Sequence, residues 1–137
     1  MSIIIGEKSK YQAKQLLNKS EREFYKKLHE LYSEDFYIGC QINLASVLNK
    51  KTNSLYISEL FRNIDFGLFT KETFRPVVLI ELNGTSHINV KSVERDEKVK
   101  QILKNSDIPL ITFYRDKNNT IQYIKKCIDN LISIYYE

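Results

Sequence analysis

Two acidic residues, Asp65 and Glu81, stand inside apolar stretches that read as neighbouring strands. Asp65 lies within residues 63–69 and Glu81 within residues 75–83; both stretches are short, rich in β-branched and aromatic residues, and bounded by turn residues. With Thr73 at the centre of the turn, position 65 faces position 81, and facing residues have Cβ atoms about 5 Å apart. Two carboxylates that close repel each other unless a divalent cation lies between them. The spacing therefore predicts a metal site.

The hydrophobic pattern favours this hairpin register over its neighbours. Position 67 then faces position 79, and a shift by one residue would mix apolar and polar side chains on both faces. One face is expected to carry Ile64, Phe66, Leu68, Val78, Ile80 and Leu82, and the other Phe69, Val77 and Leu79 followed by Asp65, Glu81 and Asn83.

Further polar residues follow the two acids at defined spacings. They read Glu81-x-Asn83-Gly84-x-x-His87, then Arg95-Asp96, then Ile-Pro-Leu-Ile at 108–111. Over roughly residues 16–114 this combination resembles the PD-(D/E)XK, or restriction-endonuclease-like, nuclease superfamily. Within it, the chain is most similar to the branch that includes very-short-patch-repair endonucleases and an uncharacterised family of small domains.

The resemblance implies a Mg²⁺-dependent nuclease that hydrolyses phosphodiester bonds in DNA, with Mn²⁺ as a substitute. Asp65, Glu81 and the main-chain carbonyl of Leu82 would hold the metal, helped by Glu21 directly or through water. The superfamily usually has lysine where this chain has Asn83. An amide there could position water or phosphate, but it supplies no positive charge.

Three residues beyond the acid pair complete the implied site. His87 would transfer a proton as general acid or base. Arg95 would bind phosphate or fix an acid, and Asp96 would orient His87 or Arg95.

Each of these residues also has a structural interpretation. Glu21 at a first helical turn is favoured by the helix dipole and can stay solvated. Asn83 begins an Asn-Gly turn signal, and a single loop histidine such as His87 often serves structure alone. Arg95 and Asp96 on a helix would ordinarily form a solvated charged pair. These alternatives remain open from the residues themselves.

The elements that must position these residues predict one α/β domain over residues 1–137. We expect an αβββαβ core, with a mixed β-sheet flanked by helices on both faces. The expected helices cover 8–17, 20–32, 92–105 and 121–135; the strands are the hairpin, 36–44 and the stretch from 108 to 113; loops cover 46–58 and 84–91. Ser20 and Glu23 predict a capping box for the second helix, whose apolar stripe includes Glu21.

Composition narrows the class of protein. The net charge of +4 and the pI near 9.0 suit a polyanionic partner without requiring one. Cys40 and Cys127 show no metal-ligand spacing and are expected to be buried free thiols. We find no signal-peptide pattern and no apolar run of membrane-spanning length, which predicts a cytoplasmic location and no membrane partner.

Three functional hypotheses follow. The first is the nuclease, with DNA favoured over RNA as its nucleic-acid partner. The alternative is a catalytically silent module of the same fold that binds nucleic acid or a protein partner, including a second copy of itself. The third is an accessory component of a toxin, immunity or phage system, whose partner brings the target.

Overall fold

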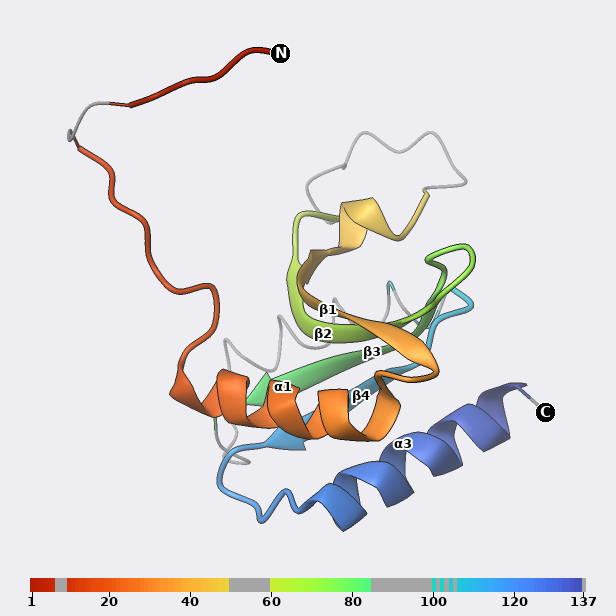
Figure 1. The fold of residues 1–137 in the computed structure, drawn as a ribbon. Coiled ribbons are helices and arrows are strands. Elements are labelled where there is room, and N and C mark those ends of the chain that lie inside the picture. The colour runs from red at the N-terminus through yellow and green to blue at the C-terminus, as the bar shows by residue number, and fades with distance from the viewer. Residues whose placement is uncertain are drawn as a thin grey trace.

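The computed structural model describes residues 1–6, 10–49, 60–84, 100, 102, 104 and 106–136 (Figure 1). Its elements are α1 (Lys19–Tyr32), β1 (Phe36–Asn43), the 3₁₀ turn η1 (Leu44–Ser46), β2 (Asn63–Thr70), β3 (Pro76–Asn83), β4 (Leu110–Tyr114) and α3 (Ile121–Tyr136). The predicted class, mixed α/β, is confirmed.

The four strands form one sheet in the order β1-β2-β3-β4. β1 pairs antiparallel with β2, and β2 pairs antiparallel with β3, whereas β4 runs parallel to β3. A parallel neighbour requires a crossover connection, and residues 100, 102 and 104, which belong to that connection, are helical. The rest of the helix predicted over 92–105 lies outside the described residues.

The predicted register of the β2–β3 hairpin is confirmed. Gly67 faces Leu79, as the pattern required, and a β-bulge between Leu68 and Phe69 shifts the last pair next to the turn. On its other side, Gly67 faces Gly39 on β1. A Cβ atom on Gly67 would come within 2.7 Å of Ile42 Cδ1 and 2.9 Å of Phe69 Cε2, so these two side chains lie directly over the glycine pair.

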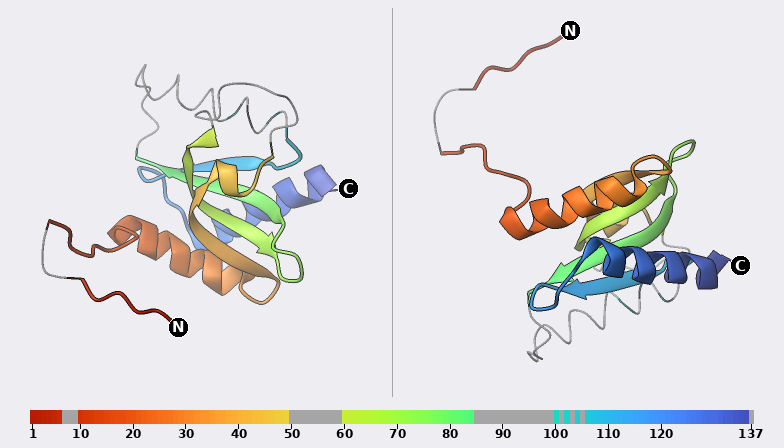
Figure 2. Two further views of the ribbon diagram at one scale, coloured as in Figure 1. Left: turned by 90° about the horizontal axis from the view of Figure 1, so that it is seen from above. Right: turned by 60° about the horizontal axis from the view of Figure 1, so that its bottom comes forward.

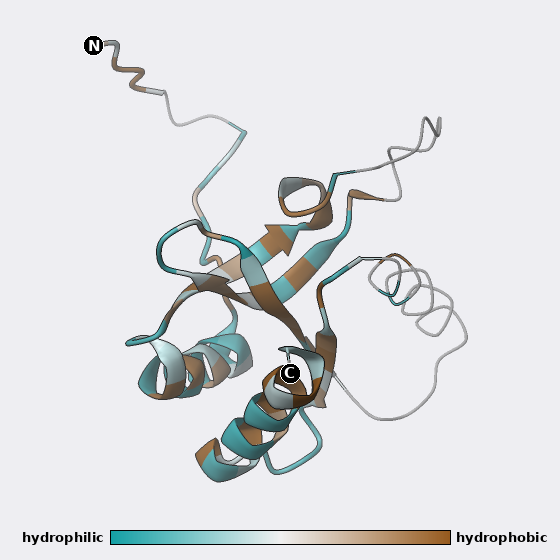
Figure 3. Ribbon diagram, turned by 90° about the vertical axis from the view of Figure 1, so that its right-hand side faces the viewer, coloured by the Kyte–Doolittle hydropathy of each residue, from teal (hydrophilic) through white to brown (hydrophobic). Residues whose placement is uncertain are grey.

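The sheet has one cluster of buried side chains on each face. On the first face, α1 and α3 lie side by side (Figure 1), and both pack against Phe66, Val78 and Ile80. The Tyr32 hydroxyl donates to Asp129 Oδ1 at 2.8 Å and links the two helices. Both helices carry apolar residues along with polar ones, as amphipathic helices do (Figure 3).

The second face packs against shorter elements. Its cluster includes Ile42, Leu44 from η1, Leu79 and Ile108, with the helical residue Ile102 against them. On this second face, the described helical residues that pack against the sheet belong to η1 and to position 102.

The short helix predicted over 8–17 is wrong for residues 10–17, none of which is helical. The chain before α1 leads away from the sheet and its helices (Figures 1 and 2), with Tyr11 and Leu16 exposed on it. Only its end, at Leu17, packs against the core among residues 10–17. A helix this short is marginal in water unless another element covers its apolar face.

The N-cap of α1 lies two residues earlier than predicted. Asn18 is the N-cap: its Oδ1 accepts from the Glu21 N–H at 2.9 Å, while Glu21 Oε1 accepts from the Asn18 N–H at 2.8 Å. The capping box is thus Asn18–Glu21, and the prediction of a Ser20–Glu23 capping box is wrong. Ser20 donates its hydroxyl to Asn18 Oδ1 instead.

These two possible caps can be distinguished by unfolding experiments. We expect Asn18→Ala to lower the free energy of unfolding by about 1 kcal/mol, because it removes the N-cap acceptor. Ser20→Ala should stay within about 0.5 kcal/mol of the wild type, since Ser20 only supports the cap. Urea denaturation measures both; a larger loss for Ser20→Ala would contradict the observed cap.

Candidate functional site

The candidate site lies where β2 separates from β3. The antiparallel pairs of these strands run from the turn as far as Phe66 and Ile80. Beyond that point β2 continues to pair with β1, through Ile64 and Ile42, while β3 continues to pair with β4. The pairing of β2 with β3 therefore ends at Phe66 and Ile80, and Asp65 and Glu81 are the next residues beyond it.

A change in side-chain alternation accompanies this separation. Cys40 and Phe66 belong to the first face, but Ile42 and Ile64 pack in the cluster of the second. Between Cys40 and Ile42, Gln41 has a φ of 52°, in the left-handed region. The sequence-based assignment of Ile64 to the face of Phe66 is therefore wrong: strict alternation fails in β2 where it follows the kinked β1.

The carboxylate of Asp65 occupies the position that β2 leaves. The N–H of Leu82 donates to Asp65 Oδ2 at 2.8 Å. If the register continued regularly, this N–H would face the main chain of residue 64. A side chain has replaced a main-chain acceptor, and it holds Asp65 against the Glu81–Leu82 peptide.

The orientation of β3 decides which main-chain groups face this site. Leu79 N–H donates to Pro109 and Asn83 C=O accepts from Arg115, so these odd-numbered residues face β4. Leu82 N–H faces β2 instead. Because the N–H and C=O of one residue in a strand point to the same side, the Leu82 carbonyl also faces the side of Asp65.

Glu81 and Asn83 are partly buried on β3, and their parity on the strand is that of Leu79, on the second face. Asp65 and Glu81 each stand one residue beyond the last β2–β3 pair, Phe66–Ile80, on two antiparallel strands. The prediction that the two acids lie on adjacent antiparallel strands is confirmed. On β1, the pairs Cys40–Phe66 and Ile42–Ile64 flank Gln41 and Asp65, so these two residues lie opposite each other.

Glu21 is engaged in structural contacts. It is only 8% exposed, with Oε1 in the capping box and Oε2 accepting from Gln41 Nε2 at 3.3 Å. Its contact with the kink of β1 was not predicted. A glutamine carries no signal for a left-handed backbone, which asparagine or glycine would have given.

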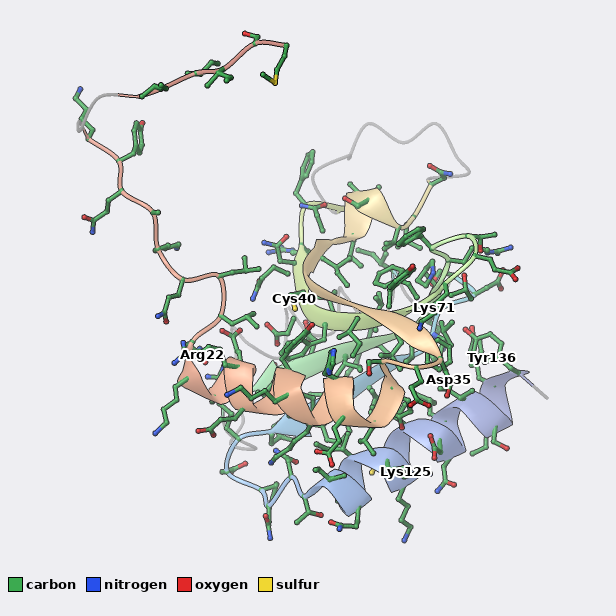
Figure 4. The ribbon with its side chains drawn as sticks, viewed as in Figure 1. Arg22, Asp35, Cys40, Lys71, Lys125 and Tyr136 are labelled. Carbon is green, nitrogen blue, oxygen red and sulfur yellow. The ribbon has the colours of Figure 1, made fainter. Side chains whose placement is uncertain are left out.

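Cys40 lies next to this contact, towards the end of the sheet where α1 begins (Figure 4). Burial, and then the negative charge of Glu21, raise the pKa of the Cys40 thiol. The thiol is therefore held in its protonated form, which is a poor nucleophile.

The described residues include no group of three or more His, Cys, Asp and Glu side chains close enough to hold a metal ion. Glu21 does not complete such a group with Asp65 and Glu81. Three predicted site residues, His87, Arg95 and Asp96, lie outside the described residues.

Comparisons with known proteins define the family. Residues 13–131 match the family described as "Protein of unknown function (DUF2726)". The chain belongs to this family. An uncharacterized protein of Haemophilus influenzae is 24% identical over 108 residues, which cover 77% of this chain and 56% of that protein. The chain thus spans little more than half the length of this relative.

No solved structure matches the chain. Neither description names an activity, so the chemistry of this DUF2726 domain has to be argued from its own residues. Within the part that the structure describes, no helix is long and apolar enough to cross a membrane.

The contact between Asp65 and Leu82 predicts different effects for two substitutions. Asp65→Ala removes the acceptor of a part-buried N–H and should cost about 1–3 kcal/mol of stability. Asp65→Asn keeps a side-chain oxygen and should cost less. Urea denaturation gives the free energies, and hydrogen exchange should show faster exchange of the Leu82 amide in Asp65→Ala alone. Equal stability of both variants would contradict a positioning role for this hydrogen bond.

Proposed function

We propose that this DUF2726 domain is a Mg²⁺-dependent nuclease with a restriction-endonuclease-like fold, acting on phosphodiester bonds in DNA. The observation that supports this most is the hydrogen bond between Leu82 and Asp65. It holds one acid beside the strand that carries the other, at the point where the sheet opens. Ordinary strand pairing would not need an acid here, since a main-chain carbonyl would serve.

The available donors suit magnesium. The Asp65 and Glu81 carboxylates and the Leu82 carbonyl are all hard oxygen ligands, which Mg²⁺ and Mn²⁺ prefer. Magnesium usually takes only one or two protein carboxylates and keeps several waters. A pair of acids is therefore sufficient, and Glu21 can remain in its structural role. When bound, magnesium would neutralise charge on a phosphate and make water a better nucleophile.

The arrangement of strands is compatible with the finer fold proposal. One helix precedes three antiparallel strands, and a crossover leads to a fourth strand parallel to β3. Residues 100, 102 and 104 of that crossover are helical, which is compatible with the αβββαβ order that the resemblance implies. Both acids then lie on the two central strands, β2 and β3.

The remaining roles follow the resemblance. His87, four residues after the end of β3, would take the proton from the attacking water or give one to the leaving oxygen. Arg95 would bind the phosphate, with Asp96 orienting it or His87. Asn83 would position water or phosphate through its amide, and it adds no charge.

Substitution of the acids tests the enzyme. We expect purified protein to cleave DNA with Mg²⁺ or Mn²⁺ and to stop when chelator is added. Asp65→Asn and Glu81→Gln should each abolish cleavage, because each removes a charge that binds the cation. His87→Ala should slow cleavage by about 10²–10⁴-fold if it transfers the proton. Gel assays with supercoiled and linear DNA provide the measurement.

The matched control is Glu30→Gln, an equivalent loss of charge at an exposed position of α1. It should cleave like the wild type. Calorimetric titration with Mg²⁺ and Mn²⁺ gives a second readout, in which the Asp65 and Glu81 variants bind more weakly and His87→Ala binds normally. Metal-independent nucleic-acid binding without cleavage would favour the silent module. Undiminished cleavage by both acid variants would show that the site is elsewhere.

The charge of the domain predicts salt-sensitive DNA binding. With a net charge of +4, most of the affinity should come from phosphate contacts. If four phosphates are neutralised, affinity should fall about 10²-fold between about 50 and about 200 mM salt. Fluorescence anisotropy in EDTA measures this, and an affinity independent of salt would count against a nucleic-acid partner.

A further inference from the structure

A pair of exposed aromatic rings lies at the other end of the sheet from Asp65. Tyr37 of β1 and Phe74 of the hairpin turn stack with ring centroids 4.7 Å apart and planes 7° apart. Their exposed fractions are 45% and 63%. The Lys71 ammonium lies 5.8 Å from the centroid of the Tyr37 ring, and Figure 4 places it at this end of the molecule.

The backbone of Phe74 is in an unfavourable conformation for its residue type. Its φ is 55°, in the left-handed region that bulky side chains rarely adopt. The turn itself is closed by main-chain hydrogen bonds, from Phe74 N–H to Thr70 and from Thr70 N–H to Arg75, each 2.9 Å. Glycine or asparagine would make these bonds with less strain.

A groove of about 560 Å³ extends from this ring pair along β1. The residues that line it include the aromatic Tyr37, Phe69 and Phe74 and the amide residues Gln41 and Asn43. The Gln41 amide also donates to Glu21, and the Asn43 amide oxygen also accepts from the Ala45 N–H. The volume lies in the range of small-molecule sites, roughly 300–1,000 Å³. Flat apolar surfaces with a few amide groups are what a nucleobase needs: a face to stack on and partners for its polar edge.

The charges around the groove are compatible with a polyanion. None of the described residues that line it is acidic, although the chain has 17 acids. The hairpin turn at its end carries Lys71 and Arg75 against Glu72, two positive charges against one negative.

The position of the groove connects it to the proposed cleavage site. From Tyr37 to Gln41 it follows five residues of β1, a distance of about 13 Å at the usual rise of a strand. Gln41 faces Asp65 in the β1–β2 register. A strand of nucleic acid lying in the groove would therefore lead from the ring pair to the acids.

We propose that this groove binds an unpaired nucleotide of the DNA substrate, with its base stacked on Phe74. The inference rests on the proposed function and adds a substrate class: DNA with a single-stranded or unpaired segment next to the cleaved bond. A paired base offers no free face to the ring, so fully paired duplex would gain nothing from this groove.

Binding in EDTA tests the groove without any cleavage. The probes are a fluorescent single-stranded oligothymidylate and a duplex of equal length. The wild type should bind the single strand more tightly. Phe74→Asn and Tyr37→Ser should each weaken single-strand binding by about 5- to 100-fold, the usual range for one lost stacking contact. Duplex affinity should change less than about twofold, because phosphate contacts dominate it.

Two variants serve as controls. Tyr37→Phe keeps the ring and should bind like the wild type. Phe61→Ala removes a phenylalanine of similar exposure, 62%, that is not among the residues lining the groove, and it should also leave binding unchanged. Thermal unfolding confirms that each variant is folded, as expected for substitutions at exposed positions.

Several results would overturn this proposal. Equal affinity for single strand and duplex, or undiminished single-strand binding by Phe74→Asn, would exclude a base in the groove. A loss of self-association in the same variants, seen by sedimentation, would instead assign the groove to a second copy of the chain. Cleavage of duplex without single-strand preference would refute the groove and leave the nuclease standing. Single-strand binding that depends on the two rings, without any cleavage, would support the groove and refute the nuclease.

Discussion

The hydrogen bond from the Leu82 amide to Asp65 is the contact on which the candidate site depends. When two strands separate inside a sheet, each leaves main-chain groups that need new partners. Here one such N–H, that of Leu82, donates to a carboxylate in place of the main-chain carbonyl of the neighbouring strand. The acid is thereby positioned by β3, although it belongs to β2. The same arrangement turns the Leu82 carbonyl towards the side of Asp65.

The separation of the strands originates in β1. The left-handed backbone of Gln41 changes the face to which the following residues point, and β2 stays paired with β1 through that change while β3 does not. The Gln41 side chain then reaches Glu21, which also caps α1. One buried carboxylate thus links the start of a helix to the kink in the sheet. Its two oxygens have structural partners, which is why it is better explained as a support of the site than as a ligand.

The sequence predicted what depends on periodicity and missed what depends on contacts between distant segments. Alternation along residues 63–83 was sufficient for the hairpin register, since a shift would have exposed Phe66 and Ile80. It failed at Ile64, because a kink at Gln41, more than twenty residues away, reverses the alternation. The prediction of a cap at Ser20 rests on Ser-x-x-Glu spacing alone, and Asn18 stands at the same spacing from Glu21. The contact of Glu21 with Gln41, which local spacing cannot reveal, favours the cap at Asn18. The acids Asp65 and Glu81 were found because an acid within an apolar strand is disfavoured without a specific partner.

Because position 83 is Asn and not Lys, no positive charge at that position offsets the two acids of the proposed site. Asp65 and Glu81 bring two negative charges to the proposed site, and Asn83 offsets neither. Without a cation, these two negative charges repel a phosphate. A second contact with the DNA, away from the acids, would add to the affinity in the absence of metal. The ring pair of Tyr37 and Phe74 could provide this contact, because stacking on a base needs no positive charge. No described residue that lines the groove beside the rings is acidic. A domain built in this way would hold its substrate at one end of β1 and require the metal only at the other.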